Sequence, residues 1–439
     1  MLRLLNKIFN IRSPEWPRVL LLCLMHFLIN GGVIWSLIIT DAAFLRYVGL
    51  EYLPWALVAS PLVSIVAISL YTAFADRVSD TTLLIAILLI AALGFGSGIV
   101  LFTLGYDTAA YAIWYPLTLI FIDIFFTLHW ATYVNSFYDT QAAKRIFPVV
   151  SAAARIAAII AGATITVLNQ FEPAVIILIW IGIMLLVATL AKLMPLILNE
   201  RRPADPASAE LSAPAARTPA SPASYLANIR EGFRYVRQSA FLRSMALATL
   251  CIYVLFALLN YQAGKIFLQE LKTVEGISSL TGWLNSLGNL LMFPILLFGL
   301  SRIIGAIGVG NASLIFPFGT LAISGALIGL PGLPTASLAY FDRTAFRVTF
   351  HATFDSLLYN AIPLRIKGRT RAFITGLVVP LGTLVGGLLL LALPASWSWV
   401  LPALIGALAL AYVASALAVR RQYSRALIDL LEQEDFSFL

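Results

Sequence analysis

Long uninterrupted stretches of apolar residues dominate the chain, and short polar loops separate them. About 20 apolar residues wound as an α-helix span the hydrocarbon core of a bilayer, which is about 30 Å thick. The hydrophobicity is continuous rather than alternating, which predicts helices and excludes membrane-spanning strands. The pattern predicts an all-α integral membrane protein with twelve transmembrane helices, at about 18–40, 53–75, 82–104, 110–135, 147–168, 173–198, 243–268, 279–300, 309–329, 335–360, 371–393 and 397–419.

A polar tract divides these helices into two sets of six. Residues from about 199 to 224 are rich in Pro, Ala and Ser, a composition typical of a mobile linker. The stretch 225–238 has apolar residues on one face and arginines on another, which predicts an amphipathic helix on the inner membrane surface. We therefore predict an N-terminal six-helix bundle (1–198), a cytoplasmic linker with the amphipathic helix (199–240) and a C-terminal six-helix bundle (241–439).

A weak internal repeat supports this division. Shifting the first half by about 221 positions lays His129 near His351 and matches Tyr138 with Tyr359. The shift pairs the fourth predicted helix with the tenth, as a parallel duplication of six helices requires. In transporters built this way the substrate binds near the midplane, between the halves.

Basic residues in the short loops predict the orientation. One side of the membrane receives most of them, including four at 365–371, whereas the other side has little beyond Arg46 and Lys272. An excess of Lys and Arg in short loops marks the cytoplasmic side. We therefore predict that both termini are cytoplasmic, in a bacterial-type plasma (inner) membrane.

Composition narrows the classes of function. The chain is 60% hydrophobic and 11% charged, with a mean hydropathy of +0.91, which excludes a soluble domain. The net charge of +8 does not predict nucleic-acid binding, because the cations lie between apolar runs. We expect the lipid bilayer and a small anionic solute as partners, and a monomer. The sequence shows no metal-ligand cluster, nucleophile triad or phosphate loop, so we expect neither an enzyme nor a cofactor.

The tenth predicted helix carries Arg343, Arg347, His351 and Asp355 at intervals of four residues. Four residues turn an α-helix by about 400°, so these side chains stay on one side of it. A charge at bilayer depth costs at least about 2.5–3.5 kcal/mol, so the column needs water or ionic partners. The arrangement is typical of a solute pathway.

Other charged residues fall inside apolar segments. Asp123 and Arg155 lie at about the depth of Arg347, near the membrane centre, at 1.5 Å per helical residue. Arginine presents a planar fork to carboxylate or phosphate and lysine a point charge, so converging cations predict an anion site. Alternatively, Asp123 pairs with either arginine simply to hold helices together. We predict substrate binding by Arg155, Lys265, Arg343 and Arg347, and a coupling or counter-ion role for Asp123, His129, His351, Asp355 and Asp41.

The loop after the second helix holds Asp76 and Arg77 in the sequence FADRVSD. It resembles the major facilitator signature, in which an acidic and a basic residue lock the inner gate, although Ala73 replaces the leading glycine. In the simpler alternative the pair caps two helix ends. The glycine-rich pieces GFGSG and LVGGLLL predict close helix packing.

Several segments together resemble the ATP/ADP translocase family, nucleotide transporters related to the major facilitator superfamily. They are AAKRIFPVVSAAARIAAIIAG, which contains Arg155, then Asn260–Tyr261–Gln262 followed by Lys265, SRIIGAIGVGNASLIFP and DSLLYNAIPLRIKGRTRAFITG. The resemblance covers nearly the whole chain. It implies an antiporter that exchanges ATP for ADP by alternating access, with phosphate held by Lys265 in a cavity lined by Arg155 and Asn260.

The chain also departs from that family. The end of its first helix reads SLIITDAAFL, which keeps Asp41 and lacks the two cations that nucleotide exchangers carry there, and Ser136 replaces an acidic residue. Either the phosphate layer is rebuilt around Arg343 and Arg347, or the substrate differs. One alternative is a proton-coupled carrier of another organic anion, in which Asp123, His129 and His351 would take up protons. The other is a membrane sensor or assembly protein that transports nothing.

Overall fold

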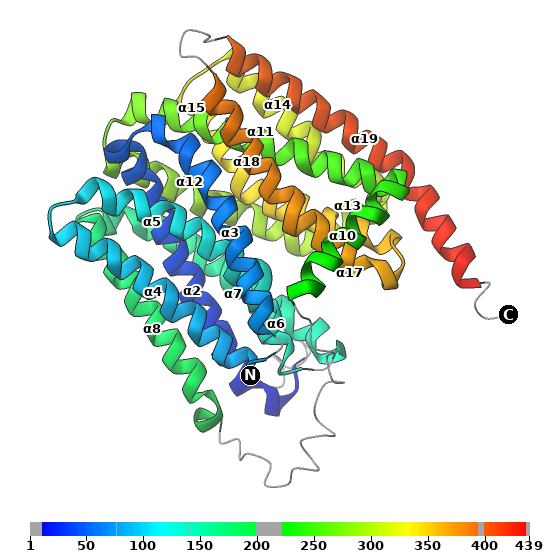
Figure 1. Cartoon of the computed structure of the whole chain (residues 1–439), viewed down its shortest axis with the longest axis horizontal. Helices are drawn as coiled ribbons and strands as arrows, with labels where there is room; N and C mark the ends of the chain where they lie inside the picture. Colours follow the sequence, from blue (N-terminus) through cyan, green and yellow to red (C-terminus); the bar gives the residue numbers. More distant parts are fainter. Residues whose placement is uncertain (1–10, 76, 139, 199–221, 394–398, 436–439) are drawn as a thin grey trace. The chain divides into compact units, whose positions relative to one another are not determined.

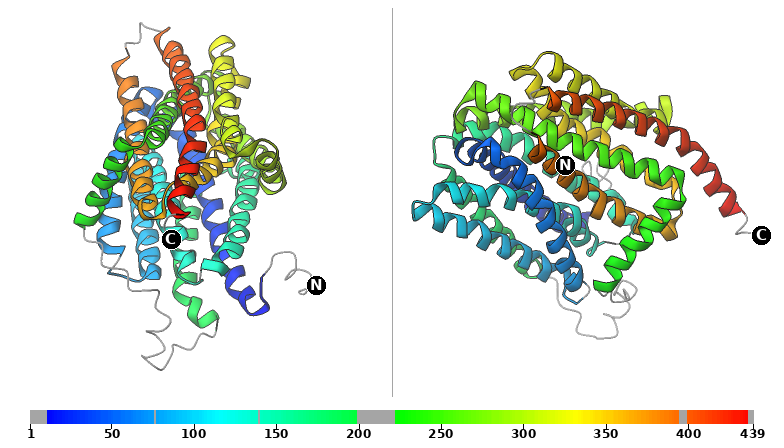
Figure 2. Two further views of the ribbon diagram at one scale, coloured as in Figure 1. Left: turned by 90° about the vertical axis from the view of Figure 1, so that its right-hand side faces the viewer. Right: turned by 45° about the horizontal axis from the view of Figure 1, so that its top comes forward.

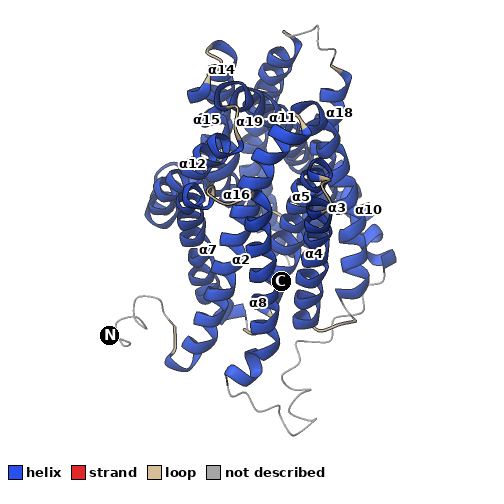
Figure 3. Cartoon of the chain, turned by 90° about the vertical axis from the view of Figure 1, so that its left-hand side faces the viewer, coloured by secondary structure: helices blue, strands red, loops and turns tan. Residues whose placement is uncertain are grey.

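The structure is a computed structural model that describes residues 11–75, 77–138, 140–198, 222–393 and 399–435. Every element of secondary structure among these residues is a helix (Figure 3). The predicted all-α class is therefore confirmed for this part of the chain.

Ten helical stretches among the described residues are long and apolar enough to cross a membrane. Many of their large apolar side chains lie on the surface, such as Leu93 with 75% and Leu196 with 73% of the side chain exposed. Apolar surface of this extent suits lipid rather than water. The stretches are Ser13–Val48, Leu50–Tyr71, Asp80–Thr103, Asp107–Asn135, Arg145–Leu168, Pro173–Ile197, Ala240–Leu271, Val274–Ala312, Ile366–Ala392 and Val400–Leu430.

Two predicted helices are not among the ten. The ninth corresponds to α14 (Ile315–Gly329), which is apolar but has only 15 residues. The tenth is a helical run of charged composition, formed by α15 (Leu333–Phe341), η6 (Asp342–His351) and α16 (Ala352–Leu358), which we call the charged segment. The count of twelve and the division into six and six stay predictions.

One predicted boundary is wrong. Helices were expected at about 279–300 and 309–329, but α12 (Val274–Pro294), η5 (Ile295–Gly299) and α13 (Leu300–Ala312) follow one another without a loop. No strong helix breaker occurs near residue 300, so winding continues there. The chain bends later, at Gly308, whose positive φ of 75° a glycine adopts without steric cost.

The chain forms two compact units, residues 1–41 with 66–223 and residues 42–65 with 224–439. Helix α3 (Leu53–Ala75) contributes to both. The first unit also holds η1 (Ser13–Glu15), α2 (Trp16–Ala43), α4 (Asp80–Thr103), α5 (Asp107–Ile122), η4 (Asp123–His129), α6 (Trp130–Asn135), α7 (Thr140–Leu168) and α8 (Pro173–Ile197). Besides the elements given above, the second unit holds η2 (Phe44–Val48), η3 (Leu50–Tyr52), α10 (Pro222–Gln238), α11 (Ala240–Leu271), η7 (Tyr359–Ala361), α17 (Leu364–Phe373), η8 (Ile374–Val378), α18 (Val379–Ala392) and α19 (Val400–Asp435).

In the first unit, α4 packs against α5 and α8 (Figure 1). The indole Nε1 of the buried Trp114 donates a hydrogen bond to the carbonyl of Phe95, at 3.0 Å. Gly98 faces the same indole so closely that a Cβ would overlap it. The close packing predicted for the first glycine-rich piece is confirmed at this position.

In the second unit, α11 is the central helix and packs along α18 and α19 (Figure 2). Gly382 faces Tyr253 of α11, and a Cβ there would lie 2.7 Å from the tyrosine Cβ. Gly386 meets Ala257 one turn further along. Gly386, which belongs to the second glycine-rich piece, therefore permits the helix contact that this piece predicts, and Gly382 extends it.

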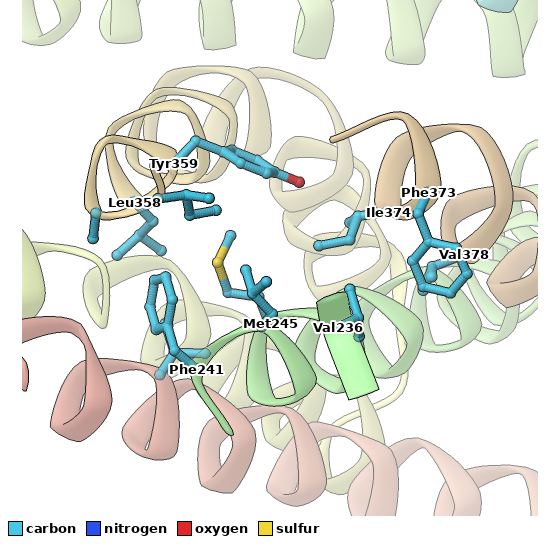
Figure 4. Packing of buried hydrophobic residues seen from close by; sticks show 12 residues of the cluster. Val236, Phe241, Met245, Leu358, Tyr359, Phe373, Ile374 and Val378 are labelled. Carbon is cyan, nitrogen blue, oxygen red and sulfur yellow. The ribbon is translucent and has the colours of Figure 1, made fainter. Parts of the chain in front are cut away.

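The amphipathic stretch forms α10, which packs on α17. Glu231 and Arg369 form an ion pair at 2.6 Å, and the rings of Phe233 and Phe373 lie 5.7 Å apart. Gly232 faces the carbonyl of Arg369 at a distance that leaves no room for a Cβ. A buried apolar cluster adjoins this contact and shares Phe373 with it. The cluster includes Val236, Phe241, Met245, Leu358, Tyr359, Phe373, Ile374 and Val378 (Figure 4).

Candidate functional site

Two helical sections with wide, π-type turns carry many of the predicted site residues. The section η4 begins at Asp123 and ends at His129, and η6 contains Arg343, Arg347 and His351. A π-type turn bonds residue i to i+5, and such turns occur frequently at functional sites. The section η4 lies in the fourth predicted helix and η6 in the tenth, and these are the two helices that the internal repeat pairs.

The wide turn corrects the expected geometry of the charged column. We predicted an α-helix, in which a step of four residues exceeds one full turn. In η6 each turn holds more residues, so the same step falls short of a full turn and the column drifts in the opposite sense. The Nε of Arg347 donates to the backbone carbonyl of Arg343 at 2.9 Å, which ties the Arg347 side chain to the preceding turn.

Both arginines lie beside aromatic rings. The Arg347 guanidinium is 6.0 Å from the ring centre of Phe256 on α11, and that of Arg343 is 5.8 Å from Tyr340. Both side chains are partly exposed. No ion pair joins either of them to a carboxylate in the described part of the chain. These guanidinium groups therefore keep hydrogen-bonding capacity for another anion.

Asp342 is the most deeply buried charged residue of the segment, with no exposed surface. Its two carboxylate oxygens accept from the hydroxyl of Thr320 on α14, at 2.9 and 3.1 Å. A buried carboxylate is costly unless it is hydrogen-bonded or paired. Thr320 therefore provides a specific contact between α14 and the charged segment, which the sequence analysis did not predict.

Glycines bring the neighbouring helices close to the charged segment. A Cβ on Gly288 of α12 would lie 3.0 Å from the Cβ of Ala345, and one on Gly319 of α14 would lie 2.6 Å from the ring of Phe346. The Phe346 ring also packs against Phe316, 5.2 Å away. These contacts fix the backbone from which the two arginines project.

The C-terminal part of the charged segment faces a small cavity of about 40 Å³. His351 and Asp355 line it, and the hydroxyl of Tyr412 on α19 lies 3.5 Å from the Nδ1 of His351. Thr249 of α11 and Ser313, between α13 and α14, add hydroxyl groups. Two predicted coupling residues therefore meet at one polar cavity within the second unit.

In the first unit, His129 is completely buried and has two hydrogen-bond partners. Its Nε2 lies 3.0 Å from the carbonyl of Asp80, which can only accept, so Nε2 carries a proton. Its Nδ1 lies 3.1 Å from the hydroxyl of Tyr71 and can accept from it. This environment suits a neutral imidazole.

The remaining predicted residues of the first unit differ in exposure. Asp123 is exposed, and Asp41 and Arg155 are partly exposed. Each has a partner within the protein. That Arg155 and Asp123 share a cavity with Arg347 stays a prediction.

Two further predicted residues lie on α11. Lys265 is exposed and Asn260 is buried, with 6% of its surface accessible. Both are on the helix that provides Phe256 beside Arg347. Of the predicted gate pair, Arg77 is exposed, whereas Asp76 lies outside the described residues.

Within the described residues, no group of three His, Cys, Asp or Glu side chains is placed to hold a metal ion. The site residues that sequence reasoning missed are Thr320, Phe256, Thr249, Ser313 and Tyr412. All are common residue types in apolar helices, and no sequence signal links them to the charged segment.

Comparisons with known proteins agree with a transporter fold. Residues 96–330 match the family described as TLC ATP/ADP transporter. No curated protein matches the chain in sequence.

Three solved transporter structures resemble the fold. A bacterial homologue of the iron transporter ferroportin, in an inward-facing state, is 12% identical with a TM-score of 0.63, over 95% of this chain and 100% of that one. A D-xylose–proton symporter is 12% identical with a TM-score of 0.60, over 94% and 97%. The nucleoside transporter NupG is 10% identical with a TM-score of 0.57, over 93% and 98%. The chain therefore shares its fold with these transporter structures.

Proposed function

Because the chain belongs to the TLC ATP/ADP transporter family, we propose that this integral membrane transporter exchanges nucleotides of the ATP/ADP type. The family match covers more than half of the chain. The finer assignment, antiport of a nucleotide, rests on the cations of the charged segment. We further propose the twelve-helix, two-bundle arrangement and cytoplasmic termini that the sequence predicts.

One observation carries this proposal. Arg343 and Arg347 lie in the charged segment and are partly exposed; no ion pair joins them to a carboxylate among the described residues, although Arg347 interacts with Asp342 at longer range. We propose that this segment crosses the membrane, where a cation is expensive, so such residues usually serve a solute pathway. Their planar forks match the oxygens of a phosphate group. An anionic solute would replace lost hydration with charge-assisted hydrogen bonds.

Two aromatic rings hold the guanidinium groups. Phe256 and Tyr340 lie next to them and are themselves buried, with 6% and 5% of their surface accessible. These cation–π contacts would keep the arginines in place for the phosphate group of a solute. Lys265, Asn260 and Arg155 would extend the site, and rocking of the two halves would expose it to either side in turn.

Counterflow in proteoliposomes tests the proposal. Vesicles loaded with ADP are supplied with labelled ATP, and uptake is compared between wild type, Arg343→Gln and Arg347→Gln. A hydrogen bond to a charged group contributes about 1.5–3 kcal/mol, so each substitution should weaken apparent affinity roughly 10- to 150-fold. Arg421→Gln, an exposed arginine of α19 with no assigned role, is the matched control and should exchange normally.

Two outcomes would change the assignment. If both variants exchange like wild type, these arginines do not bind the solute. If no nucleotide exchanges at all, the substrate is not a nucleotide, and a proton-coupled carrier of another organic anion becomes the better proposal. The polar cavity at His351 and Asp355 favours that second candidate. Its signature would be uptake driven by a pH gradient into vesicles that contain no nucleotide.

A further inference from the structure

The small cavity at the C-terminal part of the charged segment has several oxygen-bearing side chains in a largely apolar lining. Asp355 contributes a carboxylate, Thr249 and Ser313 contribute hydroxyls, and Tyr412 contributes a phenol. His351 adds an imidazole beside that phenol. The remaining lining is apolar and includes Met245 and Leu358, which belong to the buried cluster of Figure 4.

Several polar atoms of the lining have bonding capacity to spare. Ser313 donates to the carbonyl of Gly310 at 2.9 Å, which leaves its oxygen free to accept. Asp355 and Thr249 have no side-chain hydrogen bond to any described residue. Polar groups inside a membrane protein need partners, so the cavity must contain something that supplies them.

Size and charge limit what that occupant can be. A water molecule needs about 10–15 Å³ by this measure, so about 40 Å³ holds roughly three waters or one small cation with water. One carboxylate balances one positive charge, and the lining offers no second acidic group. Hard cations prefer oxygen ligands such as carboxylate, hydroxyl and water.

We propose that this cavity binds a single monovalent cation on Asp355, either a proton or Na⁺. The hydroxyls of Thr249 and Ser313, with water, would complete its surroundings. The guanidinium groups proposed to bind the solute do not line the cavity, although Arg347 interacts electrostatically with His351 at its edge. The chain would therefore hold a cation site and an anion site close together on one helix. A transporter with both can couple the movement of its solute to a cation gradient.

The other ionisable groups near Asp355 have to be considered. They are His351 and Tyr412 at the cavity, Tyr359 on η7 and Arg371 on α17. Arg371 is the one permanent cation among them, but its guanidinium lies over the Tyr359 ring, 5.8 Å from the ring centre. Arg371 is exposed and does not line the cavity. Within the described residues it forms no ion pair with Asp355 and acts on that carboxylate only at longer range, so no permanent cation lines the cavity itself.

Two measurements on the full chain in lipid nanodiscs test the proposal. In the first, thermal unfolding is followed by tryptophan fluorescence as NaCl replaces choline chloride at constant ionic strength. A ligand that binds only the folded protein raises the ratio of folded to unfolded protein by a factor of 1 + [L]/Kd. This factor is about 100 when the ligand concentration is 100 times Kd. If Na⁺ binds, the unfolding temperature of wild type rises with Na⁺, and that of Asp355→Asn does not.

The second measurement detects a proton. Infrared difference spectra between acidic and alkaline buffer should contain a carboxylic-acid carbonyl band in wild type that Asp355→Asn lacks. Asp429→Asn, an exposed carboxylate of α19 away from this cavity, is the matched control and should behave like wild type in both measurements. Thr249→Val is the substitute variant if Asp355→Asn does not fold, because it keeps the carboxylate. It should reduce the rise in unfolding temperature with Na⁺ and leave the carboxylic-acid carbonyl band in place.

The results separate the possible occupants. A Na⁺-dependent rise that Asp355→Asn abolishes identifies Na⁺, and a carbonyl band lost in that variant without a Na⁺ response identifies the proton. If neither response depends on Asp355, the cavity holds water only and the proposal is wrong. Neither assay needs a transported solute, so this outcome is independent of the counterflow result.

Discussion

The hydrogen bond between Thr320 and Asp342 can be tested by one substitution that barely changes shape. Thr320→Val replaces the hydroxyl with a methyl group and leaves the buried carboxylate without the donor that the structure shows at 2.9 and 3.1 Å. No second donor to this carboxylate occurs among the described residues. We expect the charged segment to lose its polar contact with α14.

The magnitude follows from burial. Asp342 has no exposed surface, so water cannot replace the lost donor in the folded protein. A hydrogen bond to a charged group contributes about 1.5–3 kcal/mol, and a buried polar group left without a partner costs a similar amount. We therefore expect the free energy of unfolding to fall by about 2–3 kcal/mol.

Unfolding in mixed micelles of mild and denaturing detergent, followed by tryptophan fluorescence, would measure the change. Thr320→Ser keeps the hydroxyl and should retain most of the stability. Ser324→Ala is the matched control, one turn further along α14: its hydroxyl is buried and has no hydrogen-bond partner among the described residues. Removing that hydroxyl should cost little or should stabilise the protein.

A double-mutant cycle with Asp342→Asn isolates the interaction between the two side chains. The two substitutions should be non-additive, because either one removes the same charged hydrogen bond. Equal effects of Thr320→Val and Ser324→Ala, or additive effects in the cycle, would refute the reasoning.

Three further predictions rest on single contacts. Gly319→Ala places a Cβ 2.6 Å from the ring of Phe346 and should destabilise the protein by about 1–3 kcal/mol, measured by the same detergent titration. Glu15→Gln breaks the two-pronged ion pair with Arg145, at 2.6 and 3.0 Å, and should cost about 1 kcal/mol or less, with a smaller loss at high salt. Gly232→Val puts a side chain against the backbone carbonyl of α17 and should detach α10; a spin label or fluorophore on α10 should report increased motion, whereas an unchanged signal would contradict the contact.

Hydropathy alone predicted most of the membrane helices, because lipid selects for length and apolarity. Two of the predicted spans stay predictions, because the run 333–358 carries charges and α14 has 15 residues, so neither meets a criterion of helix length and apolarity. The boundary near residue 300 was wrong because helix winding continues past the apolar run, and the chain bends only at Gly308.

The candidate site was predicted in part. The charges of the tenth predicted helix are visible in sequence, and all of them lie in one helical run, 333–358. Their partners are not visible, because Thr320 lies 22 residues from Asp342 and Tyr412 lies 61 residues from His351, on different helices. No periodicity within one helix indicates which polar residue of another will face it.

The resemblance to the ATP/ADP translocase family is confirmed by the match over residues 96–330. That resemblance rested on several motifs taken together, none of which is specific alone. The roles that it implies for Lys265, Asn260 and Arg155 stay predictions, as does the partnership of the two six-helix halves.

The wide turns of η4 and η6 have a consequence for how the chain tolerates change in length. A π-type section stores one more residue in each turn than the helix on either side of it. Deleting a single residue within 342–351 would let one wide turn of the section rewind as an ordinary α-helical turn, with both flanks still in register. A deletion of the same size in α11, which has no such reserve, would rotate every residue beyond it by about 100°. We expect the first deletion to leave a folded protein with displaced arginines, and the second to prevent assembly of the unit.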